Sequence, residues 1–70
     1  MTKFRMNKRQ LNPNHNHEVH KETCRYYNLL TQYVELGEFV FCSTALQQAR
    51  ALGYTNVDGC MECCPECHRG

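Results

Sequence analysis

The sequence predicts a small α+β domain, in which short antiparallel strands and one main helix are held together by zinc. The zinc prediction rests on the tail, because residues 60–68 contain four of the six cysteines and one of the four histidines. Thiols at this density are ligated, oxidised or reactive, and both Cys-x2-Cys pairs of the tail have the spacing of a zinc-binding turn. The strand prediction rests on residues 32–41 and the helix prediction on about residues 43–52.

The chain is short of core-forming residues. Its 70 residues include thirteen Leu, Val and Phe residues, with neither Ile nor Trp. A chain of this length buries only about 60% of its unfolded surface, and such a core rarely contributes more than ~3–5 kcal/mol net. Structural zinc offsets this shortage, since its apparent binding free energy of ~10–16 kcal/mol in small zinc fingers acts as folding free energy.

Residues 1–17 are predicted to form a flexible basic arm, with a short extended piece near Phe4, and residues 18–70 to form the zinc-binding domain. The first nine residues carry four bases and no acid, whereas the rest of the chain carries four bases and seven acids. A short basic segment of this kind either contacts phosphate or acts as a solubilising tail. The run after it is interpreted as a loop, because Pro13 disfavours helix in the residue before it.

The strand segment and the helix segment each carry local signals. Gly37 interrupts the alternation of the strand segment, which predicts a bulge or a bend at that position. In the helix segment, Ser43 or Thr44 is the expected N-cap and Gly53 is the expected left-handed C-cap. The alanine-rich stripe of the helix is interpreted as a packing face that lies against the strands.

The first choice of zinc ligands is one imidazole and three thiolates, contributed by His20, Cys24, Cys60 and Cys63. These residues form two local pairs, and the 35 residues between Cys24 and Cys60 contain the strand segment and the helix. A metal ion that closes so long a loop removes a large closure entropy. The apolar and aromatic run at residues 25–30 is expected to cover the site and exclude water.

Four further residues are alternative ligands: Cys67, Cys42, His68 and Cys64. Cys67 would share a helical face with the Cys60 pair, so it competes with the ligands of the first pair. Cys42 precedes the helix and is interpreted as a buried small hydrophobe, with a ligand or a reactive thiol as alternatives. A second ion bound by these four residues together also remains open.

A cytoplasmic location is expected. No apolar signal-peptide core follows the basic first residues, and no stretch has the length and hydrophobicity of a membrane span. Thiols stay reduced in the cytoplasm, which favours metal binding over a disulfide framework. The vicinal Cys63-Cys64 pair also disfavours such a framework, because neighbouring cysteines rarely bond each other without strain.

Four motifs follow one another in a fixed order: His20-x3-Cys24, Gly37-Glu38-Phe39, Ala45 through Gly53-Tyr54, and Cys60-x2-Cys63. Over about residues 18–64 this series resembles the metal-binding domain of the Ada DNA-repair protein and the related small zinc domains appended to some bacterial nucleases. The resemblance implies zinc and an α+β fold with a small sheet and one helix. The sequence departs from that family in the longer link over residues 55–59 and in the extra residues 64–68.

The resemblance also bears on enzymatic activity. In the Ada domain, the first cysteine of the C-x3-C pair is a zinc-activated thiolate that accepts a methyl group from a DNA phosphotriester. His20 occupies that position in this sequence, and a zinc-bound imidazole has no free nucleophilic lone pair. Methyl acceptance is therefore not expected at this position.

The expected function is that of a non-catalytic, zinc-stabilised binding module with a nucleic acid or a protein as partner and no membrane contact. The sequence contains no HExxH motif and no deaminase signature, and Glu62 and Glu66 are interpreted as solvated acids. The alternative is cysteine-thiolate chemistry through Cys42 or Cys64, as an alkyl acceptor, in metal transfer or in redox sensing. A third interpretation is a structural subunit whose thin core is completed by a partner.

Overall fold

The computed structural model describes residues 1–8 and 16–69. Its elements follow in the order strand β1 (Thr2–Asn7), strand β2 (His17–Lys21), 3-10 helix η1 (Tyr27–Leu29), strand β3 (Tyr33–Phe39), helix α1 (Cys42–Ala51), strand β4 (Val57–Gly59) and 3-10 helix η2 (Pro65–Cys67). The four strands form one sheet, and α1 is the α-helix of the described residues. The predicted α+β fold with one main helix is confirmed.

The sheet has the strand order β3-β1-β2-β4, so β1 and β2 are its two inner strands. β1 pairs antiparallel with both β2 and β3, whereas β2 and β4 pair in parallel, with Val19 opposite Gly59. The expectation of antiparallel strands is therefore wrong for this pair. A parallel pair needs a long crossover connection, and the segment from β3 through α1 supplies it.

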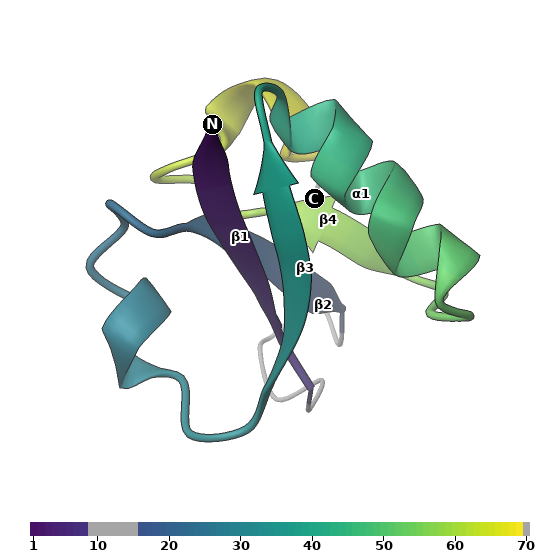
Figure 1. The fold of residues 1–70 in the computed structure, drawn as a ribbon, viewed down its shortest axis with the longest axis horizontal. Helices are drawn as coiled ribbons and strands as arrows, with labels where there is room; N and C mark the ends of the chain where they lie inside the picture. Colours follow the sequence, from purple (N-terminus) through teal and green to yellow (C-terminus); the bar gives the residue numbers. More distant parts are fainter. Residues whose placement is uncertain (9–15, 70) are drawn as a thin grey trace.

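Helix α1 packs on the sheet, and Figure 1 shows α1 and η1 on opposite sides of the strands. The main core lies between α1 and the sheet. Ala45 and Ala49 have no exposed surface, and such small side chains let the helix lie close to the strands, as predicted for the alanine stripe. The buried residues of this core are Phe4, Met6, Val19, Leu36, Cys42, Ala45, Leu46, Ala49, Cys64 and Cys67.

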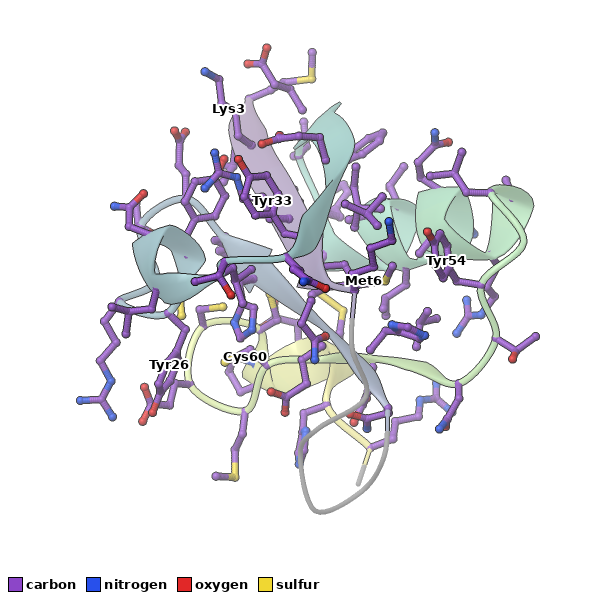
Figure 2. All side chains as sticks on the ribbon, turned by 90° about the horizontal axis from the view of Figure 1, so that it is seen from below. Lys3, Met6, Tyr26, Tyr33, Tyr54 and Cys60 are labelled. Carbon is purple, nitrogen blue, oxygen red and sulfur yellow. A yellow bond between two sulfur atoms is a disulfide. The ribbon has the colours of Figure 1, made fainter. Side chains whose placement is uncertain are left out.

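The prediction of a flexible arm is wrong for the beginning of the chain. Thr2–Asn7 form an inner strand, and the side chains of Phe4 and Met6 are 0% exposed. Figure 2 shows Lys3 at the outer edge of the molecule and Met6 in its interior. The segment alternates apolar and charged residues, as a half-buried strand does, and burial of the apolar row outweighs the charge of the other row. The predicted loop over residues 12–17 is wrong at its end, because Asn16 is buried and His17 begins β2; residues 12–15 lie outside the described residues.

Helix α1 begins one residue before the predicted segment, at Cys42, and Phe41 is its N-cap. The predicted side-chain cap from Ser43 or Thr44 is wrong, because the N-cap position makes no side-chain hydrogen bond. At the other end Gly53 has a φ of +99°, and Tyr54 N–H donates to Ala49 O at 3.2 Å. This left-handed C-cap confirms the prediction for Gly53. Among the described residues, no helix is both long enough and apolar enough to cross a membrane.

The interruption at Gly37 is a bulge, as predicted. Phe4 lies opposite Gly37, but Arg5 lies opposite Glu35, so the register of β3 shifts by one residue there. Gly37 has a φ of +114°, a left-handed conformation that favours glycine. The shift places Leu36 in the core and lets Phe39 pack against the same core.

Candidate metal centre

The first-choice ligands lie at the ends of two neighbouring parallel strands. His20 is in β2 and Cys24 is in the turn that follows it, whereas Cys60 directly follows β4 and Cys63 is in the next turn. Since β2 and β4 run in the same direction, both turns lie at the same end of the sheet. Cys60 N–H donates to Val19 O at 3.0 Å, which continues the strand pairing up to the first tail cysteine.

Both turns are held by backbone hydrogen bonds. Cys24 N–H donates to Lys21 O at 2.9 Å, and Cys64 N–H donates to Cys60 O at 2.8 Å. Lys21 N–H also points at Cys63 Sγ, at 3.4 Å. A backbone N–H aimed at a sulfur atom stabilises its thiolate form, so this contact prepares Cys63 to bind a cation.

The four side chains form a compact group, which we call the Cys3His cluster: His20, Cys24, Cys60 and Cys63. One ligand atom of each residue lies within 4.8 Å of the others, and His20 Nδ1 is 3.7 Å from Cys24 Sγ. With Zn–S bonds of about 2.3 Å and Zn–N bonds of about 2.0–2.1 Å, ligand atoms around a tetrahedral zinc lie roughly 3.5–3.8 Å apart. The Cys3His cluster therefore needs only a small contraction around an ion.

The Cys3His cluster is enclosed by the protein. His20, Cys24 and Cys60 are buried and Cys63 is half-buried; in Figure 2, Cys60 lies among other sulfur atoms in the interior. The ring of Tyr27, in η1, is buried against Cys24 and Cys60 in a second, smaller core. The run at residues 25–30 thus covers the cluster through Tyr27, whereas Leu29 of the same run is exposed.

The environment keeps the metal-free ligands neutral. Burial raises the pKa of Cys60 to about 12 and raises the pKa of Cys24. The hydrogen-bonding contact with Cys64, together with burial, raises the pKa of Cys63. Burial lowers the pKa of His20. At neutral pH the thiols are therefore protonated and the imidazole is uncharged, so a cation would have to displace the thiol protons to bind here.

Binding of Zn²⁺ to the metal-free chain at pH 7 should therefore release about three protons, one for each thiol of the Cys3His cluster. Because the thiols of the metal-free chain carry their protons at pH 7 whether they are buried or exposed, the apparent zinc affinity should rise as the pH increases towards the thiol pKa values. Calorimetric titrations in two buffers of different ionisation enthalpy measure the release. A His20→Cys variant is the matched control, with a release of about four protons. A release of one proton or fewer in the parent chain would contradict a three-thiolate site.

The alternative ligands lie elsewhere. Cys42 and Cys67 form a disulfide with Cα atoms 6.5 Å apart, so the expectation of fully reduced thiols, and of Cys67 as a competing zinc ligand, is wrong for this pair. His68 Nδ1 lies 3.1 Å from Gly59 O and 3.3 Å from Asp58 Oδ2. Cys64 has no exposed surface, and its Sγ is 3.7 Å from Cys63 Sγ.

The disulfide follows from the path of the tail. A Cβ atom on Gly59 would lie 2.7 Å from Cys67 Cβ and 2.9 Å from Cys64 O, so the tail turns back tightly over the end of β4. The buried carboxylate of Asp58 holds this turn, because Arg69 N–H donates to its Oδ1 at 2.8 Å. The turn brings Cys67 to the first residue of α1, a proximity that spacing along the chain does not indicate.

A pocket of about 440 Å³ opens beside this disulfide, and we call it the Cys42 pocket. Cys42, Cys67, Glu66 and Lys21 are part of its wall. Glu62 and Glu66 are both exposed, as predicted for solvated acids. One Glu66 carboxylate oxygen also lies 3.1 Å from Cys42 Sγ, and Glu62 accepts a hydrogen bond from Arg25 at 2.5 Å.

Sequence reasoning missed the contribution of Arg5 to this region. Its guanidinium stacks on the rings of Tyr27 and Tyr33, 4.1 Å and 4.0 Å from their centroids, and donates to Glu35 at 2.6 Å. Arg5 therefore links β1 and β3 to the segment that covers the Cys3His cluster. The alternation of apolar and charged residues over 2–7 could have predicted this contribution, since it places Arg5 on the face of β1 opposite the core.

Comparison of the chain with protein-family models, with curated proteins and with solved structures finds no match.

Proposed function

We propose that the chain is a non-catalytic binding module that folds around one structural zinc ion, bound by the Cys3His cluster. The convergence of four nitrogen and sulfur ligand atoms within 4.8 Å of one another carries this proposal. Sets of three cysteines and one histidine are typical of structural zinc, and softer thiolate ligands favour zinc over magnesium or calcium. Four protein ligands complete a tetrahedral coordination, which leaves no position for an activated water.

We further infer that the partner is a protein rather than a nucleic acid. The guanidinium groups of Arg5, in the predicted arm, and of Arg25, outside it, are engaged with Glu35 and Glu62, which weakens the case for phosphate contacts by these two bases. Val40 and Phe41 are adjacent in sequence, and 69% and 66% of their surfaces are exposed. They lie next to each other at the Cys42 pocket, and exposed aromatic side chains of this kind are enriched in protein interfaces.

The alternative of thiolate chemistry has less support. A reactive cysteine needs an accessible thiolate, yet Cys64 has no exposed surface and Cys42 is in a disulfide. Alkyl acceptance at Cys64 would require the core beneath η2 to open. Cys42 has no free thiol while its disulfide with Cys67 is intact.

Two measurements test the proposed function. Native mass spectrometry of the chain with its disulfide intact should find one zinc per chain. A photo-crosslinking amino acid placed at position 41 should capture one discrete protein in cells, whereas the same group at the exposed position 47 on α1 should not. Equal capture at both positions would argue against an interface at Val40 and Phe41.

A nucleic-acid partner has a different signature. Phosphate contacts make the logarithm of the affinity fall linearly with the logarithm of the salt concentration. Fluorescence anisotropy of labelled single-stranded and double-stranded oligonucleotides at low salt is therefore expected to show no binding. Tight binding with a steep salt dependence would replace the protein partner by a nucleic acid and leave the zinc proposal intact.

A further inference from the structure

The Cys42 pocket contains a second group of metal-ligating side chains. One carboxylate oxygen of Glu66 and the sulfur atoms of Cys42 and Cys67 all lie within 4.8 Å of one another. Cys42 is the first residue of α1, where the N-terminal end of a ten-residue helix favours a thiolate over a thiol. Sulfur and carboxylate oxygen are both established zinc ligands.

The contact between Glu66 and Cys42 is incomplete while the disulfide is intact. A carboxylate oxygen and a disulfide sulfur are both hydrogen-bond acceptors, so their approach to 3.1 Å contains no donor. A thiol proton or a cation between the two atoms would complete it. A disulfide sulfur carries no proton, and a metal ion binds the thiolate form of cysteine. Either arrangement therefore requires the bond between Cys42 and Cys67 to be broken.

We propose that reduction of the Cys42–Cys67 disulfide creates a second, solvent-open zinc site formed by Cys42, Cys67 and Glu66. The disulfide masks both sulfur atoms as ligands, because a metal binds the thiolate form. The two sulfur atoms at the Cys42 pocket can therefore bind zinc only after a reductant has broken the disulfide. This site is independent of the Cys3His cluster, with which it shares no residue.

The reduction is a two-electron exchange with a dithiol. The dithiol loses two electrons and two protons and closes to its own disulfide, while the S–S bond of the chain breaks and two S–H bonds form. Zn²⁺ then replaces the two thiol protons, which pass to solvent. Two thiolates on a tetrahedral zinc lie roughly 3.8 Å apart, a separation that side-chain rotation can reach between Cα atoms 6.5 Å apart.

The environment suits an ion with three protein ligands. Two thiolates and a carboxylate together carry three negative charges, and Zn²⁺ neutralises two of them. Lys21, in the wall of the same pocket, supplies a positive charge that balances the third. The pocket of about 440 Å³ leaves room for a water molecule or another small ligand at the fourth position. The site thus differs from the closed Cys3His cluster, since three protein ligands and one open position are the pattern of reactive zinc sites.

Counting bound zinc in the two redox states of the full chain tests this proposal. The chain is reduced with a dithiol, freed of it without air, loaded with zinc and compared with the oxidised chain by native mass spectrometry. The reduced chain, folded around the zinc of its Cys3His cluster, should bind one zinc more than the oxidised chain. Co²⁺ used in place of zinc should add sulfur-to-cobalt charge-transfer absorption on binding of this extra ion.

Two matched variants locate the extra ion. Glu66→Gln removes an exposed ligand and should weaken the extra zinc at least about tenfold, since even outer-shell partners of a metal contribute about 10–100-fold. Glu62→Gln changes the other exposed acid of the tail and should leave its affinity unchanged. Equal zinc counts in the two redox states would overturn the proposal, and so would an extra ion that binds Glu66→Gln as tightly as the parent chain.

Discussion

Removal of zinc is expected to unfold the chain. After treatment with a strong chelator at neutral pH, the far-ultraviolet circular dichroism of α1 and the sheet should be lost, and it should return when zinc is added back. The reason is that a structural zinc supplies an apparent ~10–16 kcal/mol, whereas a core of this size contributes at most ~3–5 kcal/mol net and this chain is short of large apolar side chains. The Cys42–Cys67 disulfide, worth about 3.5 kcal/mol for a loop of its length, does not replace the zinc.

A Cys60→Ser variant should reproduce this loss in the presence of zinc, because the thiolate is buried between the two turns of the Cys3His cluster. The matched control is Cys64→Ala, which changes an equally buried cysteine outside the cluster. It should keep its zinc and lose only about 1 kcal/mol of unfolding free energy from the small cavity. Retention of both zinc and fold in Cys60→Ser would contradict the proposed site.

Phe4→Ala is expected to lower the unfolding free energy of the zinc-loaded chain by about 3–5 kcal/mol. Phe4 is completely buried on an inner strand, where its ring lies 6.2 Å from that of Phe39. A cavity at this position costs as much as the whole net contribution of a core of this size. Urea unfolding followed by circular dichroism, at fixed zinc concentration, gives the difference.

Lys3→Ala is the control for this substitution, since Lys3 is the exposed neighbour on the other face of β1. Its effect should stay within about 0.5 kcal/mol, as is usual for surface positions. If Phe4→Ala had an equally small effect, the first residues would behave as the flexible arm that their charge predicts.

Local sequence signals predicted several features because the interacting residues are close along the chain. The helix end at Gly53 follows from one left-handed residue, and the bulge at Gly37 follows from one break in alternation. The geometry also brings together the four residues chosen as first-choice ligands. The two residues of each local pair are only three or four positions apart, so a single turn positions them.

Charge misled the sequence prediction for β1. Residues 2–7 contain the apolar alternation of a strand, but three bases in the first eight residues suggested a solvated arm. Only the tertiary structure shows a partner on each side of this strand, since β2 and β3 pair with it. Two buried side chains on an inner strand are enough to order a segment that carries several charges on its other face.

The sequence by itself predicted the two local Cys/His pairs, the position of the helix and the need for a stabilising link in so short a chain. The tertiary structure decided how distant segments meet: the parallel pairing of β2 with β4 brings the two ligand pairs to one end of the sheet. It also decided that Cys67 reaches Cys42 across a separation of 25 residues, with Glu66 beside them. The physical reason is that turns and caps depend on backbone preferences of a few adjacent residues, whereas strand order and disulfide partners depend on which surfaces pack together.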